Sequence, residues 1–324
     1  MTHLRWGILG AANFAAEHMG PAIHAAKGAE LAALATSDPA KAARFQAYAP
    51  GLKVHSSYDD LLSDPDVDAV YIPLPNHLHV EWSLRALEAG KHVLCEKPMT
   101  MKAVEFDTLI AARDRAGKLA AEAFMIVHHP QFVRARELLA SGAIGTLRHV
   151  DAVFSYFNND QGNIRNQAGA GGGGLPDIGV YTFGSARFVT GQEPEAVPFA
   201  HIDWENGVDT FVQMAARFPD FTYSAVISMR LFNRQEVVFH GDEGVLRMTC
   251  PFNAAVHDQA ELSLETAGQV RRIERFPGVN HYVRQVEAFC EAALSGADYA
   301  CPLEFSKGTQ RMMDMTFAAA KAGA

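Results

Sequence analysis

The first third of the chain alternates short apolar segments with stretches that are long enough to form helices. The apolar segments are expected to be strands, at Leu4–Leu9, Glu30–Thr36, Val67–Ile72, Lys91–Cys95 and Leu119–Phe124. Strands that are separated by helices of about ten or more residues pair in parallel, because a parallel crossover needs that much chain. The pattern therefore predicts an α/β domain with a parallel sheet.

The pattern changes from about Arg148, where strands follow one another without regular helices between them. The expected strands are 149–157, 210–218, 223–229, 235–241, 244–250 and 261–265, and the expected closing helices are 281–294 and 305–322. Such a run of strands indicates a largely antiparallel sheet in an α+β domain. Because 324 residues exceed the usual size of one hydrophobic core, we predict two domains, at residues 1–123 and 124–324.

Charge and cysteine content narrow the possible partners and the compartment. The formal net charge of -9 argues against non-specific binding to nucleic acid or to an anionic membrane surface. The four cysteines form neither a C-x-x-C pair nor a dense framework, which favours free thiols in a reducing cytoplasm. The chain start does not fit a signal peptide, and no apolar run approaches the roughly 20 residues of a membrane span. We therefore expect a cytoplasmic protein.

A turn typical of dinucleotide binding follows the first strand. The G-x-G-x-x-G pattern reads Gly10, Ala12 and Ala15 here, with alanine in place of two glycines. Small residues let the backbone approach a pyrophosphate, which then lies at a helix N-terminus. Because a strand precedes the turn and a helix follows it, we predict a dinucleotide site rather than an ordinary tight turn.

The end of the second strand bears on the choice between NAD and NADP. A carboxylate at this position binds the adenosine 2′-hydroxyl of NAD and would repel the 2′-phosphate of NADP. The strand ends at Thr36 and Ser37, and Asp38 is expected to cap the helix that starts at Pro39. With these small hydroxyls at the strand end, and Lys41 and Arg44 one or two turns beyond, NADP is favoured, while use of both cofactors remains possible.

Glu96, Lys97 and Pro98 follow the fourth strand, at the edge where open α/β sheets bind ligands. The Lys97 ammonium can polarise a carbonyl or hydroxyl beside a cofactor, and Glu96 can hold it in place. Asp177 and Tyr181 are four residues apart, which places both on one face of a helix. Tyr181 can transfer the proton that accompanies a hydride if a cation such as Lys97 favours its anion. The alternatives to a catalytic role are that Glu96 and Lys97 form a solvated surface pair, and that Asp177 caps a helix while the Tyr181 ring packs in the core.

Several motifs resemble the glucose-fructose oxidoreductase and inositol dehydrogenase (Gfo/Idh/MocA) family of nicotinamide-dependent enzymes. They are WGILGAA at 6–12, IPLPNHLH at 72–79, AGKHVLCEKP at 89–98, EAFM at 122–125, GGG with D-x-G-x-Y at 172–181 and PLE at 302–304. Inositol dehydrogenase-like members have histidine at the position of Tyr181. A tyrosine there, together with the WGILG opening, resembles the dimeric dihydrodiol dehydrogenase and NADP-dependent xylose dehydrogenase subgroup. The resemblance implies a Rossmann domain, an open-faced sheet domain that forms homodimers or higher even oligomers, and hydride transfer on a sugar-like or vicinal-diol substrate.

The resemblance also implies roles for individual residues. Lys97, Asp177 and Tyr181 would be catalytic, and Met125 and Arg165 would join them in binding substrate. Residues 1–123 would bind the cofactor, and residues 124–324 would bind substrate and form the oligomer. The residues expected to bind NADP or NAD are Gly10, Ala12, Asn13, Phe14, Ala15, Thr36, Ser37, Lys41, Pro75, Asn76, His79, Glu96 and Lys97.

Two departures from the family pattern affect the cofactor and the substrate. Relatives often carry Ser-Arg where Thr36 and Ser37 stand, and an aromatic residue with an arginine where Ile126 and Val127 stand. Two other functions remain open: a non-catalytic nucleotide-dependent sensor, and a hydrolase or lyase that oxidises and re-reduces its substrate with a tightly held NAD. The closely spaced histidines bring no carboxylate or thiolate cluster with them, so we do not expect a metal site.

Overall fold

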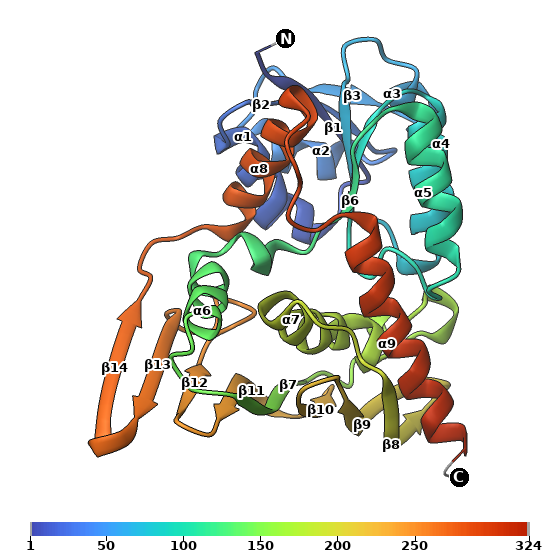
Figure 1. Ribbon diagram of the computed structural model, residues 1–324. Helices are drawn as coiled ribbons and strands as arrows, with labels where there is room; N and C mark the ends of the chain where they lie inside the picture. Colours follow the sequence, from blue (N-terminus) through green and yellow to red (C-terminus); the bar gives the residue numbers. More distant parts are fainter. Residues whose placement is uncertain (1, 323–324) are drawn as a thin grey trace. The chain divides into compact units, whose positions relative to one another are not determined.

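The computed structural model describes residues 2–322. Tertiary contacts divide the chain into two compact units (Figure 1). Unit 1 comprises the chain up to Met125 together with His281–Lys307, and unit 2 comprises Ile126–Asn280 together with the chain from Gly308 onward. The chain therefore returns to unit 1 after it has completed the sheet of unit 2.

Unit 1 is built on a six-stranded sheet in which all neighbouring strands are parallel. In spatial order the strands are β3 (Lys53–His55), β2 (Ala29–Ala35), β1 (Leu4–Leu9), β4 (Ala69–Ile72), β5 (His92–Cys95) and β6 (Ala120–Glu122). The chain first extends the sheet from β1 through β2 and β3, and then returns to the other side of β1. This reversal confirms the predicted Rossmann architecture.

Helices cover both faces of this sheet (Figure 1). They are η1 (Ala15–Met19), α1 (Gly20–Ala25), α2 (Pro39–Gln46), α3 (Tyr58–Leu62), η2 (Asn76–Leu78), α4 (His79–Glu88), α5 (Glu105–Ala116) and α8 (His281–Ser295), and η3 (Met125–His128) follows β6. On one face α3, α4 and α5 bury a core that includes Leu61, Leu87 and Phe106. On the other face α1 and α8 pack together and against β2.

Helix α8 belongs to unit 1 although it follows the sheet of unit 2 in the sequence. The ring of Phe289 lies 5.0 Å from that of Trp6 in β1, and both side chains are fully buried. Tyr282 meets the ring of Phe14 edge to face at 5.6 Å. The prediction that residues 124–324 form one domain is wrong for 281–307, because the apolar face of α8 finds its partner on the first sheet. The predicted boundary at residue 123 lies close to the observed one after Met125.

Unit 2 contains an eight-stranded sheet. In spatial order the strands are β14 (Val270–Arg275), β13 (Glu261–Thr266), β12 (Gly244–Met248), β11 (Arg230–Gly241), β7 (Leu147–Phe157), β10 (Thr222–Ser228), β9 (Val208–Arg217) and β8 (Ala196–Glu205). Strands β7 and β10 are parallel and all other neighbours are antiparallel. The predicted, largely antiparallel second sheet is therefore confirmed.

The long helices of unit 2 lie on one side of its sheet, as Figure 1 shows. They are α6 (Pro130–Ala140), α7 (Val180–Thr190) and the end of α9 (Leu303–Ala322). Short helical turns η4 (Ile164–Asn166), η5 (Ala168–Ala170) and η6 (Leu175–Gly179) precede α7, and η7 (Ala267–Gln269) precedes β14. Toward the helices β7 presents the buried Val150 and Phe154. The other face mixes ion pairs such as Arg234–Glu236 with partly exposed apolar residues such as Val226.

Strands β8 and β14, which form the two edges of this sheet, were not predicted from the sequence. β8 contains Pro198 and ends in Asp203-Trp204-Glu205, and β14 carries four charged residues among its six. Edge strands often carry proline and charge, because these residues prevent further pairing with other chains. The same composition makes an edge strand resemble a loop in the sequence. The short β3 and α3 of unit 1 were also missed.

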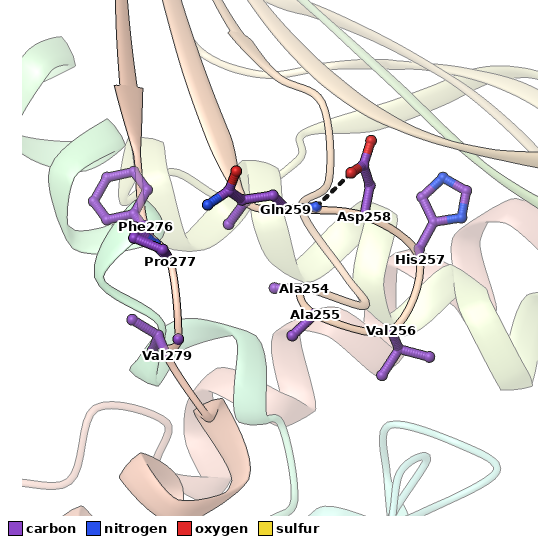
Figure 2. A pocket seen from close by; sticks show the side chains of 11 residues that line it. Ala254, Ala255, Val256, His257, Asp258, Gln259, Phe276, Pro277 and Val279 are labelled. Atoms are coloured by element: carbon purple, nitrogen blue, oxygen red, sulfur yellow. Dashed lines mark hydrogen bonds between the residues drawn. The ribbon is translucent and has the colours of Figure 1, made fainter.

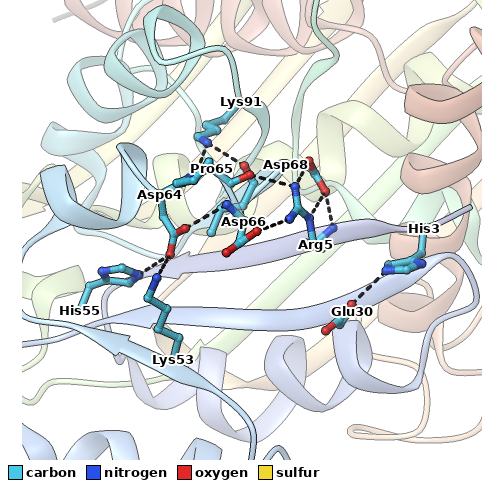
Figure 3. A network of polar contacts seen from close by, with 11 residues as sticks. His3, Arg5, Glu30, Lys53, His55, Asp64, Pro65, Asp66, Asp68 and Lys91 are labelled. Atoms are coloured by element: carbon cyan, nitrogen blue, oxygen red, sulfur yellow. Dashed lines mark hydrogen bonds and ion pairs between the residues drawn. The ribbon is translucent and has the colours of Figure 1, made fainter. Parts of the chain in front are cut away.

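A polar network holds the segment between α3 and β4 in unit 1 (Figure 3). The Asp64 carboxylate, with 2% of its side chain exposed, lies 2.7 Å from Lys53 Nζ and 2.9 Å from His55 Nε2. It also accepts the backbone N–H of Asp66 at 2.9 Å. The buried Nζ of Lys91 donates to the Asp64 carbonyl at 2.7 Å. The bond from Lys53, followed by that from Asp66, lowers the pKa of Asp64 to about 2.

We predict that Asp64→Asn lowers the free energy of unfolding at pH 7 by on the order of 1–2 kcal/mol. The ionised carboxylate stabilises the fold above its ordinary pKa of 3.8, and this contribution is lost as the pH falls toward 2. The variant should therefore show a flatter dependence of stability on pH between about 4 and 2. Urea unfolding at several pH values measures both effects. The control Asp298→Asn, at an exposed position, should match wild type, and an unchanged Asp64→Asn profile would contradict the prediction.

Candidate active site

The loops that follow β1, β4 and β5 emerge side by side at one edge of the sheet in unit 1. The parallel ladder aligns Ile8 of β1 with Tyr71 of β4, and Ile72 of β4 with Cys95 of β5. The strand order reverses between β1 and β4, which is where open α/β sheets bind ligands. The structure thus brings three predicted segments together: Gly10–Ala15, Pro75–Asn76 and Glu96–Lys97.

The turn after β1 fits the pyrophosphate of a dinucleotide. Gly10 has a φ of 107°, and a Cβ at this position would lie 3.1 Å from Leu74 and 3.3 Å from the Tyr58 hydroxyl. Helix η1 begins at Ala15, and no side chain caps its N-terminus. Uncapped N–H groups at the positive end of a helix attract an anion, and the small residues before them leave room for it. Asn13 and Phe14 lie in the same turn.

The end of β2 offers hydroxyls and a nearby cation. Asp38 accepts the N–H of Ala40 at 2.9 Å, so its carboxylate caps α2, as predicted. Thr36 accepts the N–H of Asp38 at 3.2 Å, and Ser37 and Lys41 are exposed. This arrangement leaves hydroxyl groups, rather than a carboxylate, at the strand end.

Arg44 of α2 reaches the dinucleotide turn. Its guanidinium donates to Asn13 Oδ1 at 2.6 Å and to Glu17 Oε1 at 3.0 Å. It therefore connects α2 to the turn after β1, where its charge is paired with Glu17.

The loop after β5 is held by buried groups on its neighbours. The Tyr71 hydroxyl donates to Glu96 Oε1 at 2.6 Å, and burial, with the charge of Glu96, raises the pKa of Tyr71, so it stays a donor. Glu122, at the end of β6, accepts the N–H of Met99 at 2.8 Å. These bonds fix both sides of Lys97, which is half-buried.

Glu122 is a buried carboxyl whose structural role the sequence analysis did not identify. Burial raises its pKa, while the Met99 N–H, Ser306 and the charge of Lys97 act in the opposite direction. The Glu122 carboxyl therefore supplies a hydrogen-bond acceptor to the loop that carries Lys97. The EAFM motif at 122–125 signals this position, but the sequence alone does not say that its acid points to the Lys97 loop.

His79, which was predicted to contact the cofactor, is buried between the loops that follow β4 and β5. Its ring is fully buried, with Nδ1 2.8 Å from the Pro98 carbonyl and Nε2 2.7 Å from the Leu74 carbonyl. Because both nitrogens face backbone oxygens, the ring binds two loops of the protein. The predicted cofactor contact of His79 would have to be made without these ring nitrogens, since both face backbone carbonyls. His79 joins the loops after β4 and β5.

In unit 2 the predicted residues Asp177 and Arg165 meet. Asp177 lies in η6, a π-helical turn that continues into α7. Its Oδ2 accepts the Tyr156 hydroxyl at 2.7 Å and Arg165 Nε at 2.9 Å. The charge of Asp177 raises the pKa of Arg165, and burial, with that charge, raises the pKa of Tyr156. Two strong donors thus hold this carboxylate in one orientation.

Tyr181 follows at the start of α7 and is buried in an aromatic cluster. Its ring centre lies 5.7 Å from those of Phe154 and Phe252, which stack on each other at 4.8 Å. The charge of Asp177 is the largest cause of the raised pKa of Arg165, and burial acts against it, while Tyr156 and Tyr181 add to the rise. Arg165 is therefore within electrostatic reach of the Tyr181 phenol.

A cavity of about 380 Å³ lies in the segment that follows Phe252 (Figure 2). It is lined by small and apolar residues of two loops, with a few polar side chains: Ala254, Ala255, Val256, His257, Asp258, Gln259, Ala260, Phe276, Pro277, Gly278 and Val279. Its polar lining side chains are His257, Asp258 and Gln259, and no lysine or arginine is among the lining residues.

The predicted site residues thus form two groups. Lys97 and the cofactor residues lie in unit 1 together with Met125, which is buried at the start of η3, and Arg165, Asp177 and Tyr181 lie in unit 2. Among residues 2–322, no group of three or more His, Cys, Asp or Glu side chains is placed to hold a metal ion. The sequence analysis missed Tyr156: strand alternation places it on the helix-facing side of β7, but nothing in the pattern singles it out.

Comparisons with known proteins agree with this geometry. The family model described as "Oxidoreductase family, NAD-binding Rossmann fold" matches residues 4–124, and the "GFO/IDH/MocA C-terminal domain" model matches residues 132–247. An uncharacterized oxidoreductase of Rhizobium meliloti is 38% identical over 100% of this chain and 98% of its own length. D-xylose 1-dehydrogenase (NADP⁺) 2 of Haloferax volcanii is 34% identical over 99% of this chain and 98% of its own.

A solved structure extends the similarity to the whole fold. The 3-ketoreductase of Actinomadura kijaniata, in complex with NADP and TDP-benzene, superposes with a TM-score of 0.89 at 32% identity, covering 98% of each chain. The order of the strands, the sequence motifs and the relatives all indicate the same family. The chain therefore belongs to the GFO/IDH/MocA family of oxidoreductases.

Proposed function

We propose that this protein is an NAD(P)-dependent oxidoreductase that moves a hydride between nicotinamide and a carbinol or carbonyl carbon of a sugar-like or vicinal-diol substrate. Relatives named as sugar and diol oxidoreductases support this class, among them D-xylose 1-dehydrogenase and trans-1,2-dihydrobenzene-1,2-diol dehydrogenase. The observation that carries the proposal is the Asp177 carboxylate, held by Tyr156 and Arg165 one helical turn before Tyr181. Unit 1 binds the cofactor, and unit 2 binds the substrate.

The residues of the chain supply positioning and proton transfer. When it is bound, the nicotinamide supplies or accepts the hydride. Lys97 polarises the substrate oxygen, and Tyr181 donates a proton to that oxygen or removes one from it. Arg165 lies within electrostatic reach of Tyr181, and its positive charge favours the phenolate.

Asp177 acts as an acceptor for substrate hydroxyl groups. Its bonds to Tyr156 and Arg165 keep the carboxylate fixed before substrate arrives, so little ordering remains to be done on binding. Met125 completes the substrate contacts.

We expect Lys97→Ala and Tyr181→Phe each to lower kcat by about 10²-fold or more, which is the usual scale for loss of a positioned acid-base group. A panel of pentoses, hexoses and vicinal diols with NADP and NAD identifies the substrate for steady-state kinetics. The double variant should lose less than the product of the single losses, because the two groups act on one oxygen.

The control for this experiment is Lys102→Ala, an exposed lysine five positions away, which should leave kcat unchanged. A Tyr181→Phe enzyme with near wild-type turnover would remove Tyr181 from proton transfer. Absence of turnover with every member of the panel, despite cofactor binding, would contradict the proposed activity.

NADP is proposed to bind at least as tightly as NAD. The carboxylate that follows β2, Asp38, is directed to the start of α2, which it caps through Oδ1. Arg44 brings a positive charge near the turn. Both features favour the 2′-phosphate over the free 2′-hydroxyl.

Ser37→Arg should strengthen NADP binding about tenfold, which corresponds to about 1.4 kcal/mol, through a charge-assisted contact to the 2′-phosphate. NAD binding should change little, since NAD lacks this phosphate. Isothermal titration with both cofactors measures the difference, and Ser141→Arg, at an exposed position in unit 2, is the control. A tenfold preference of the wild-type protein for NAD would contradict the proposal.

The sheet face opposite α6 and α7 is proposed to form a homodimer or a higher even oligomer. Partly exposed Val226, Val238 and Phe211 lie on this face among polar pairs, and a homodimer would cover them.

Cys95, Cys250, Cys290 and Cys301 are buried free thiols, which supports a reducing compartment such as the cytoplasm. No helix within residues 2–322 is long and apolar enough to span a membrane.

We expect Val226→Asp to raise the dissociation constant of the oligomer at least tenfold, because the interface would bury an unpaired charge. Light scattering across micromolar concentrations measures the assembly state. Ser295→Asp, at an exposed position in unit 1, should leave that state unchanged. A wild-type protein that is monomeric at these concentrations would refute the proposed interface.

A further inference from the structure

Asp209 is a buried carboxylate on the helix-facing side of the sheet in unit 2. Its residue is 1% exposed, and none of the steps proposed above uses it. Its Oδ2 accepts the backbone N–H of Leu175, the first residue of η6, at 2.5 Å. The N–H of Gly174 also bonds to this carboxylate. The acid therefore takes two N–H groups at the start of the helix that carries Asp177 and Tyr181.

A β-bulge places Asp209 on this side of the sheet. The ladder between β8 and β9 pairs Asp203 with Phe211 but Trp204 with Asp209, so that Thr210 is an extra residue. Without this insertion, strand alternation would turn position 209 to the opposite face. Bulges of this kind re-aim side chains and are frequent beside active sites.

The glycine run fits closely around this carboxylate. A Cβ on Gly173, whose φ is 133°, would collide with Asp209 Oδ1, and a Cβ on Gly172 would lie 2.5 Å from the Arg165 carbonyl. The Gly173 N–H donates to the same Arg165 carbonyl at 2.9 Å. The segment 172–175 therefore contacts two groups: the Asp209 carboxylate, through its N–H groups, and the backbone of Arg165. Arg165 is the residue whose side chain holds Asp177.

We propose that Asp209 is a positioning residue for the reaction, whose ionised carboxylate anchors the start of η6 and thereby fixes Asp177 against Tyr156 and Arg165. A negative charge at a helix N-terminus is stabilising, and its bonds to N–H groups are charge-assisted. Asp209 does not touch the reacting atoms in this scheme. The kinetic part of this inference rests on the proposed function.

Protonation of Asp209 weakens this anchor. Burial raises its pKa to about 6, against the bonds from Leu175 and Gly174, and the charge of Asp177 adds to the rise. Asp177 is the charged group of η6 that faces Asp209, and Arg165 and Tyr156 bond to Asp177. As the pH falls below about 6, the carboxylate loses the charge that attracts the two N–H groups.

The first experiment uses the wild-type protein and needs no activity. The amide resonances of Gly174 and Leu175 should shift with pH about a midpoint near 6, because their acceptor titrates. In Asp209→Asn this titration should disappear, and hydrogen exchange of residues 173–181 should become at least tenfold faster. Asp151→Asn is the matched control, because Asp151 lies on the opposite face of the same sheet and accepts from Ser224 at 2.6 Å. If the amide resonances of Gly174 and Leu175 do not titrate in the wild type, the proposal that the Asp209 carboxylate anchors η6 is wrong.

The second experiment separates positioning from general stability. The wild-type kcat is expected to fall below about pH 6, where Asp209 takes up a proton. Asp209→Asn should lower kcat at least tenfold at pH 7.5, leave KM for NADP within twofold, and abolish this dependence on pH. A wild-type kcat in Asp209→Asn, or a kcat loss with an unchanged pH profile, would overturn the positioning role. If the wild type turns over no member of the sugar panel, the proposed function fails, and the amide titration still decides whether Asp209 anchors η6.

Discussion

The parallel ladder that joins β1 to β4 is the interaction on which the cofactor half of the protein depends. It sets the carboxyl ends of two strands that are far apart in sequence at one edge. The Gly10 turn, the Pro75–Asn76 loop and the Lys97 loop can share a ligand only because these strands, with β5, are parallel and adjacent. His79 adds a second constraint, since its buried ring joins the loops after β4 and β5 through two backbone carbonyls.

Buried carboxylates organise both units in the same way. Glu122 accepts a backbone N–H beside Lys97, and Asp209 accepts backbone N–H groups before Asp177. An uncompensated carboxylate would be costly in a protein interior, so each needs donors at fixed positions, and it fixes the loop that supplies them. Asp177 differs because its two donors are side chains, Tyr156 and Arg165. Hydrogen-bond donors at fixed positions therefore set the orientation of each of these three acids, Glu122, Asp177 and Asp209.

Much of the fold and of the site could be predicted because the relevant signals are local. Strand alternation with helices, the small residues at 10–15 and the Asp38 cap each depend on neighbours in sequence, and the structure confirms the sheet, the turn and the cap. The misses involve distant partners or edge positions. Helix α8 was assigned to the wrong unit because its packing on Trp6 is not encoded nearby. Strand β14 was missed because an edge strand is as charged as a loop.

The sequence by itself determined the architecture, the dinucleotide turn and the residue types available for chemistry, because periodicity and turn residues report on local backbone structure. The tertiary structure alone decided which of these residues meet. It buried His79 between two loops, brought Arg165 and Tyr156 to Asp177, and turned Asp209 toward η6 by a single extra residue in β9. Such contacts depend on strand register and on helix packing between segments far apart in the chain, which no local pattern records.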